Sequence, residues 1–69
     1  MIVDVFDIES LTIPMGAKTY ADIHKIMLEN FGLTPYNDSH WMYNVADESK
    51  FTIFQLKHSK HIAFISYEN

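Results

Sequence analysis

The feature that most constrains the fold is one stretch of helical periodicity, bounded at both ends by residues that stop a helix. Thr19 is a suitable N-cap, Asp22 stands where a capping box needs an acceptor, and Gly32 accepts a left-handed backbone. Because the apolar residues between them recur at helical spacing, the segment predicts an amphipathic helix packed on a core. These apolar residues are Tyr20, Ile23, Ile26, Met27, Leu28 and Phe31.

The remaining regular segments are typical of short β-strands, because they are rich in β-branched and aromatic residues and end at turn-forming residues. Pro14 cannot donate to a sheet ladder, so its strand is expected at an edge. In a chain of 69 residues without linkers or repeats, one α+β domain spanning residues 1–69 follows. We expect a single helix on a mixed, β-grasp-like sheet of four to five strands in the order ββαβββ, with the first and last strands parallel. The predicted strands are 2–6, 11–15, 40–45, 50–56 and 62–67.

Three stretches, taken in order, carry a family resemblance: LTIPMGAKTYADIHKIMLENFGL, HWMYNV and KHSKHIAFI. They are similar to the ubiquitin-like domains of the Ras-association and FERM-lobe type. That resemblance implies a β-grasp fold and binding of a small GTPase through basic residues on the first two strands and the helix start. Here those strands carry Asp4, Asp7 and Glu9, and only Lys18 lies near the helix start. A shorter stretch, DIHKIMLENFGLTPY, resembles the first helix and following loop of barstar-type nuclease inhibitors.

The predicted strands are apolar on both faces. Segment 40–45 places Trp41, Tyr43 and Val45 on one face and His40 and Met42 on the other. A single helix covers only one face of a sheet. The pattern therefore predicts an exposed apolar surface that binds a protein partner or forms a homodimer through the uncovered face, unless the loop 33–39 folds across it.

The charge pattern favours a partner with a basic surface. Nine carboxylates outweigh five lysines, arginine is absent, and the formal net charge is −4. Such a chain repels phosphates and lacks the residue that most often reads bases, so nucleic-acid binding is disfavoured. The alternative use of the lysines is a single-stranded nucleic-acid surface with interleaved stacking rings. It would comprise Lys50, Lys57, Lys60, Phe51, Phe54 and Phe64.

Catalytic and metal-binding patterns are lacking in the sequence. There is no cysteine, and His58 and His61 form the only close histidine pair, which we interpret as solvated turn residues because a metal site needs three or four ligands. No nucleophile elbow, phosphate loop or dinucleotide fingerprint occurs. We expect no enzyme activity, no cofactor and no metal. Without a signal-like start or an apolar run of membrane length, a cytoplasmic protein is expected.

These observations predict a small, acidic, non-catalytic protein-binding module that acts as a regulator or inhibitor by docking on a protein partner. The start at Met and the lack of a linker are compatible with a whole protein, and an excised domain is the alternative. Carboxylates steer it to a basic surface, and aromatic side chains supply contact area. The predicted contact residues are Asp4, Asp7, Glu9, Tyr36, Asp38, Trp41, Tyr43, Asp47 and Glu48.

Overall fold

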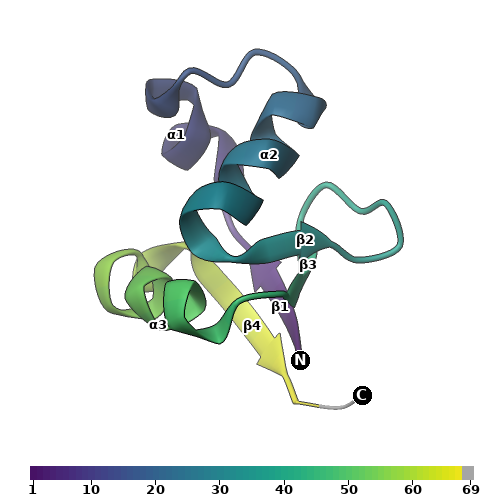
Figure 1. Ribbon diagram of the computed structural model, residues 1–69, viewed down its shortest axis with the longest axis vertical. Helices are drawn as coiled ribbons and strands as arrows, with labels where there is room; N and C mark the ends of the chain where they lie inside the picture. Colours follow the sequence, from purple (N-terminus) through teal and green to yellow (C-terminus); the bar gives the residue numbers. More distant parts are fainter. Residues whose placement is uncertain (68–69) are drawn as a thin grey trace.

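The computed structural model describes residues 1–67, and Figure 1 shows the arrangement of its elements. Four strands and three α-helices make up the described chain, with two short 3₁₀ turns, η1 and η2, directly after α1 and α3. Within residues 1–67 no helix has the length and apolar character needed to cross a membrane. The elements are β1 (Ile2–Val5), α1 (Ile8–Thr12), η1 (Ile13–Met15), α2 (Tyr20–Phe31), β2 (Leu33–Pro35), β3 (Met42–Val45), α3 (Glu48–Lys57), η2 (Ser59–His61) and β4 (Ile62–Ser66).

The strands form one antiparallel sheet in the order β2-β3-β1-β4. The chain passes from β1 to β2 through α1 and α2, yet β3 lies between these two strands. It passes from β3 to β4 through α3, and β1 lies between those. This connectivity is the split β-α-β arrangement of ferredoxin-like domains. The predicted α+β class is confirmed, but the parallel central pair is wrong, because β4 runs antiparallel to β1.

Helix α2 is the element that the sequence predicted correctly at both ends. The Thr19 hydroxyl accepts the Asp22 amide at 3.2 Å, and the Asp22 carboxylate accepts the Thr19 amide at 3.1 Å, which completes a capping box. Gly32 ends the helix with φ 66°, a left-handed conformation that glycine adopts without a steric penalty.

Two predicted strands are helical, so the described chain has three α-helices rather than one. Segment 11–15 belongs to α1 and η1, where Pro14 stands at a first-turn position that tolerates a missing N–H. Segment 50–56 belongs to α3, which the Asp47 side chain caps by accepting the Lys50 amide at 3.1 Å. Helix α3 is apolar on two sides, and a sequence of this kind also fits the alternation of a strand, which explains the wrong prediction.

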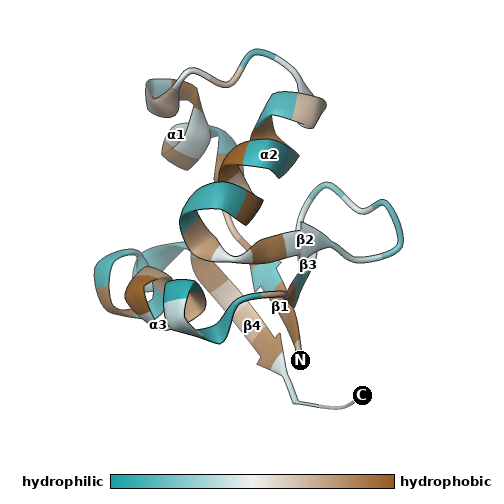
Figure 2. Cartoon of the chain, in the orientation of Figure 1, coloured by the Kyte–Doolittle hydropathy of each residue, from teal (hydrophilic) through white to brown (hydrophobic). Residues whose placement is uncertain are grey.

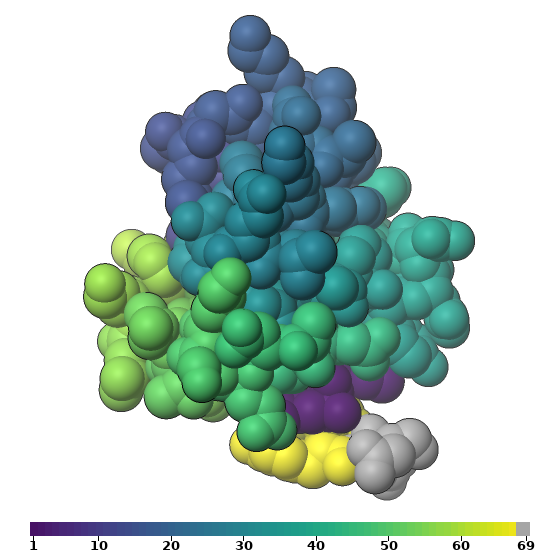
Figure 3. All heavy atoms as spheres, viewed as in Figure 1, coloured from purple at the N-terminus to yellow at the C-terminus, as the bar shows by residue number. Residues whose placement is uncertain are grey.

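The core lies between one face of the sheet and the helices. Val3, Tyr43 and Leu33 from the strands and Met27 and Phe54 from the helices are each fully buried. Figure 3 shows α2 and α3 hiding most of the sheet from the viewer. The opposite face bears no helix in the described part of the chain. It carries Ile2, Asp4, Met42, Asn44, Phe64 and Ser66 in the cross-strand register.

Gly32 also connects helices α2 and α3. Its carbonyl accepts the Ala46 amide at 2.7 Å and the Asp47 amide at 3.1 Å, so the end of α2 holds the start of α3. A Cβ built on Gly32 would lie 2.4 Å from the Asp47 carbonyl oxygen, a contact that real side chains do not make. The absence of a side chain at residue 32 therefore sets how closely α2 and α3 approach.

Candidate functional site

The loop between β2 and β3 packs against the first turn of α2 through stacked aromatic rings. The His40 ring stacks on the Tyr20 ring with centroids 3.7 Å apart and an interplanar angle of 17°. His24, one turn further along α2, stacks on His40 at 5.7 Å. The Val5 amide donates to the Trp41 carbonyl at 2.8 Å, which ties the start of β3 to the end of β1.

We call this surface the acidic–aromatic corner. It takes in side chains from α1, α2 and the β2–β3 loop. Glu9 shares a pocket with Tyr20, the charge of Asp38 acts on His24, and Trp41 follows His40 in the chain. Its most exposed large side chains are Trp41, which is 57% exposed, and Tyr20, which is 48% exposed. The corner comprises Glu9, Tyr20, His24, Asp38, His40 and Trp41.

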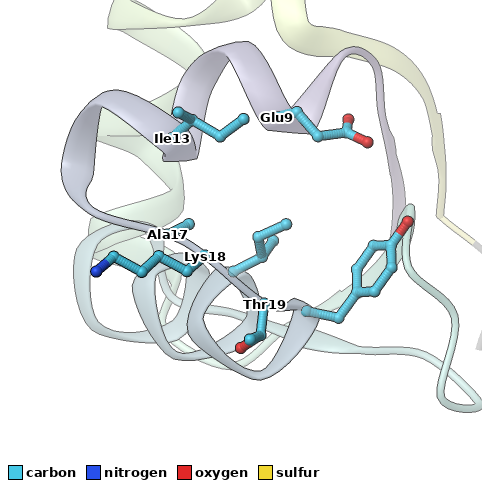
Figure 4. Close-up of a pocket in the computed structure, with 7 residues that line it drawn as sticks. Glu9, Ile13, Ala17, Lys18 and Thr19 are labelled. Atoms are coloured by element: carbon cyan, nitrogen blue, oxygen red, sulfur yellow. The ribbon is translucent and has the colours of Figure 1, made fainter.

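A small pocket of about 210 Å³ adjoins the corner between α1 and α2. Its lining includes Glu9 and Tyr20 of the corner, together with Ile13, Ala17 and Lys18. Figure 4 shows Glu9 and Lys18 on opposite sides of the pocket, with the Lys18 ammonium group pointing away from it. The pocket is smaller than the roughly 300 to 1,000 Å³ typical of small-molecule sites, so its size suits a single inserted side chain.

The carboxylates of the corner act on its neighbours electrostatically. Burial raises the pKa of the Tyr43 phenol, and the charge of Glu9 raises it further. Burial is also the main reason that the pKa of His24 is lowered; His40 lowers it further, and Asp38 acts in the opposite direction. The His24 Nε2 atom is buried without a hydrogen-bond partner. Burial thus favours the neutral form of His24 within the aromatic stack.

The structure gathers only some of the predicted contact residues. Glu9, Asp38 and Trp41 lie in the corner. The amide of Tyr36 donates to the Met42 carbonyl at 2.8 Å, so Tyr36 stands at the base of the same loop, and its side chain is partly buried. Asp7 begins α1 and accepts the Ser10 hydroxyl at 2.8 Å.

The other predicted contacts lie elsewhere. Asp4 is on the uncovered sheet face, opposite Met42 and Phe64 in the register. Asp47 and Glu48 begin α3, where the Asp47 carboxylate serves as the helix cap. The prediction for Tyr43 is wrong: it is fully buried, because the helix-covered face of the sheet includes it, and its hydroxyl donates to the His40 carbonyl at 3.2 Å.

The alternative nucleic-acid surface loses two of its three predicted stacking rings. Phe51 is 3% exposed and Phe54 is fully buried, since α3 turns both rings into the core, so neither can stack on a base. Phe64 is 64% exposed, but its cross-strand neighbour is Asp4, whose charge repels phosphate.

The histidine pair at the end of α3 differs from its interpretation as solvated turn residues. His61 is buried, and its Nδ1 atom lies 2.9 Å from the Phe6 carbonyl oxygen. The His58 and His61 rings are 6.2 Å apart. Within residues 1–67 no three histidines or carboxylates are placed to hold a metal ion together.

Sequence reasoning missed the stack of Tyr20, His24 and His40. One signal was present: Tyr20 and His24 are four residues apart, so they share a face of α2. The approach of His40 depends on the path of the β2–β3 loop, which no local pattern indicates.

Comparisons of the chain with models of protein families, with curated proteins and with solved structures gave no match. The likenesses to Ras-association domains and to barstar-type inhibitors remain predictions from short motifs.

Proposed function

We propose that the chain is a non-catalytic protein-binding module that docks through the acidic–aromatic corner on a lysine- or arginine-rich segment of a protein partner, and so regulates or inhibits that partner. The observation that carries this proposal is the exposure of Tyr20, at 48%, in a pocket that Glu9 also lines. Trp41, at 57%, is the exposed residue that follows His40, the ring stacked on Tyr20. Trp and Tyr are enriched among the residues that dominate binding energy at protein interfaces.

A cationic partner fits both components of the corner. Lys and Arg side chains are attracted to the faces of Trp and Tyr rings, by about 0.5 to 2 kcal/mol per pair depending on exposure. The same groups are attracted to carboxylates, and the net charge of −4 speeds the approach of a basic surface. Because the Lys18 ammonium group points away from the pocket, it leaves the Glu9 side open to an incoming cation.

The loop of the corner is held by several contacts within the chain. The Tyr20–His40 stack and the Val5–Trp41 hydrogen bond fix the β2–β3 loop at two points. The Ser39 hydroxyl accepts the amides of Trp41 and Met42 at 3.2 and 3.1 Å, which fixes the loop further. A surface ordered in advance loses little conformational entropy on docking, and so retains more of its contact energy as affinity.

Affinity capture with matched variants tests the proposal. The chain is immobilised, partners are captured from lysate and identified by mass spectrometry, and the affinity of the leading partner is measured by calorimetry. Trp41→Ala and Glu9→Lys are each expected to weaken that affinity, by about 30-fold for the tryptophan, which corresponds to a hot spot of about 2 kcal/mol.

The control variants make comparable changes on other surfaces: one truncates an exposed apolar side chain, and one reverses a carboxylate. Leu56→Ala removes an exposed apolar side chain from α3, and Glu29→Lys reverses an exposed carboxylate on α2. Circular dichroism should be unchanged in all four variants. A partner whose affinity drops with Leu56→Ala or Glu29→Lys, and not with the Trp41 and Glu9 variants, would contradict docking at the corner.

A further inference from the structure

The two edges of the sheet differ in how well they are protected against pairing with another strand. Strand β2 forms one edge, has three residues and ends at Pro35, which has no N–H to offer. Strand β4 forms the other edge, over Ile62–Ser66, and carries neither a charged residue nor a proline. Figure 2 shows that β4 is hydrophobic over most of its length. Strand β4 is therefore an edge without a protecting charge or proline, and its one irregularity is a register shift against β1 between Asp4 and Val5, near the start of the strand.

The hydrogen-bond pattern shows which backbone groups of β4 face outward. The Val5 amide donates to Trp41 beside β3, and the Phe6 amide donates to His61 beside β4, so alternate residues of β1 bond to opposite neighbours. A register shift between Asp4 and Val5 leaves Ala63 as an extra residue on β4, so β1 keeps its alternation and Asp4 faces β4, opposite Phe64. The amide and carbonyl of Ile65, the next residue, consequently point away from the sheet.

We infer that β4 pairs with β4 of a second copy of the chain, in an antiparallel dimer that joins the two sheets. An isologous two-fold contact needs a self-complementary surface, and an antiparallel strand pair provides one. A two-fold axis perpendicular to the sheet places both helical layers on the same side of the joined sheet. The contact lies at the opposite edge of the sheet from β2 and is independent of docking at the corner.

The two ends of β4 carry opposite charges, which favours this pairing. Lys60 is exposed in η2, two positions before the strand begins, on a surface that Asp7 also lines. Glu48 of α3 lines a surface pocket together with Tyr67, directly after the strand. In an antiparallel pair each end lies beside the opposite end of the other copy, so Lys60 of each copy approaches Glu48 of the other. A chain with a net charge of −4 thus meets its copy where the charges attract.

The uncovered sheet face suits a second copy less well. Asp4 lies between Met42 and Phe64 in the register, near the middle of that face. Two copies stacked face to face would bring their carboxylates together without cations to neutralise them. Pairing at the β4 edge leaves Asp4 in solvent.

Sedimentation equilibrium over a range of concentrations tests the inference. The apparent mass should rise from 8.1 kDa toward twice that value, and the Ile65 amide should exchange with deuterium at least about tenfold more slowly in concentrated samples than in dilute ones. Phe64→Lys should weaken the dimer by about tenfold or more, because a lysine on an edge strand opposes pairing. Ile13→Lys makes the same change at a site 58% exposed on η1 and should leave the dimer intact.

A charge exchange tests the geometry. Glu48→Lys and Lys60→Glu should each weaken the dimer, by about three- to tenfold, and the double variant should restore most of the affinity because the pairs re-form with reversed signs. A mass that stays at 8.1 kDa at millimolar concentration overturns the inference. A dimer that persists in Phe64→Lys with an unprotected Ile65 amide overturns the β4 contact.

Discussion

Replacing Gly32 by alanine should destabilise the protein far more than the same change at its other glycine. A Cβ at residue 32 would meet the Asp47 carbonyl oxygen at 2.4 Å and the Asp47 Cβ at 2.7 Å, so the α2 terminus and the α3 start must separate. That separation lengthens the bonds from the Gly32 carbonyl to the amides of Ala46 and Asp47. It also moves the residue that caps α3.

The expected cost is the sum of three effects. A left-handed backbone costs an L-residue about 1 to 2 kcal/mol. The weakened hydrogen bonds cost about 1 kcal/mol, and partial loss of the α3 cap costs about 1 kcal/mol more. The total of about 3 to 4 kcal/mol is a large share of the roughly 3 to 10 kcal/mol that a domain of this size has.

Urea unfolding followed by far-ultraviolet circular dichroism measures the effect, and Gly16→Ala is the control. Gly16 also has positive φ, at 100°, but its Cβ would meet nothing within 4 Å. Gly16→Ala should therefore cost only the backbone effect, about 1 to 2 kcal/mol. Gly32→Asn separates the causes, because asparagine accepts a left-handed backbone yet retains the Cβ, and it should stay strongly destabilised. If Gly32→Ala costs no more than Gly16→Ala, the close packing of α2 against the α3 start does not limit stability.

Three further predictions concern stability. Thr19→Ala removes the hydroxyl that accepts the Asp22 amide and should lower stability by about 1 kcal/mol, measured as a Tm lower by about 4 to 8 °C; an unchanged Tm would show that the cap is not needed. The pKa of His24 is lowered, so the unfolded chain takes up the proton first, and the free energy of unfolding should fall as the pH drops below about 6.5. His24→Phe keeps the stack and should reduce that slope in urea titrations at several pH values; an unaltered slope would assign it to other groups. Phe54→Ala should cost about 3 to 5 kcal/mol in urea unfolding, because the ring is fully buried, whereas Ile53→Ala, at a residue 49% exposed, should cost under about 1 kcal/mol; equal costs would contradict the orientation of α3.

Local signals predicted the parts of the fold that local interactions determine. Helix α2 was found because its stripe, its capping box and Gly32 all indicate the same segment. Strands β1, β3 and β4 were found because β-branched and aromatic residues fill them. The α+β class followed from that mixture of elements.

The errors arose where tertiary packing decides the conformation. In 50–56 the apolar residues Phe51, Ile53, Phe54 and Leu56 fit a strand as well as a helix. The local feature that indicates a helix is Asp47, an N-cap three residues before Lys50. The wrong prediction of a parallel last strand followed from this error, because a helix between β3 and β4 changes the direction in which β4 returns.

The candidate site was predictable in part. Exposed carboxylates and a tryptophan in a loop predict a contact surface, and Glu9 lines a pocket with Tyr20, whose ring stacks on His40 of the same loop as Asp38 and Trp41. Their role as contacts stays a prediction. Tyr43 was misassigned because alternation within a strand does not show which face the helices cover. Tyr20 and His40 were missed because their stacking joins a helix to a loop 20 positions away in the sequence.

The fluorescence of Trp41 provides the most direct test of docking at the acidic–aromatic corner. Trp41 is the single tryptophan of the chain and is 57% exposed, so its emission reports on this surface alone. Titration with a captured partner that lacks tryptophan, or with the lysine- or arginine-rich segment of that partner, should shift the emission to shorter wavelength and saturate. Glu9→Lys should weaken the apparent affinity by about tenfold, since it replaces an attraction by a repulsion. A partner that calorimetry shows to be bound while the Trp41 emission stays unchanged would place the docking surface elsewhere on the molecule.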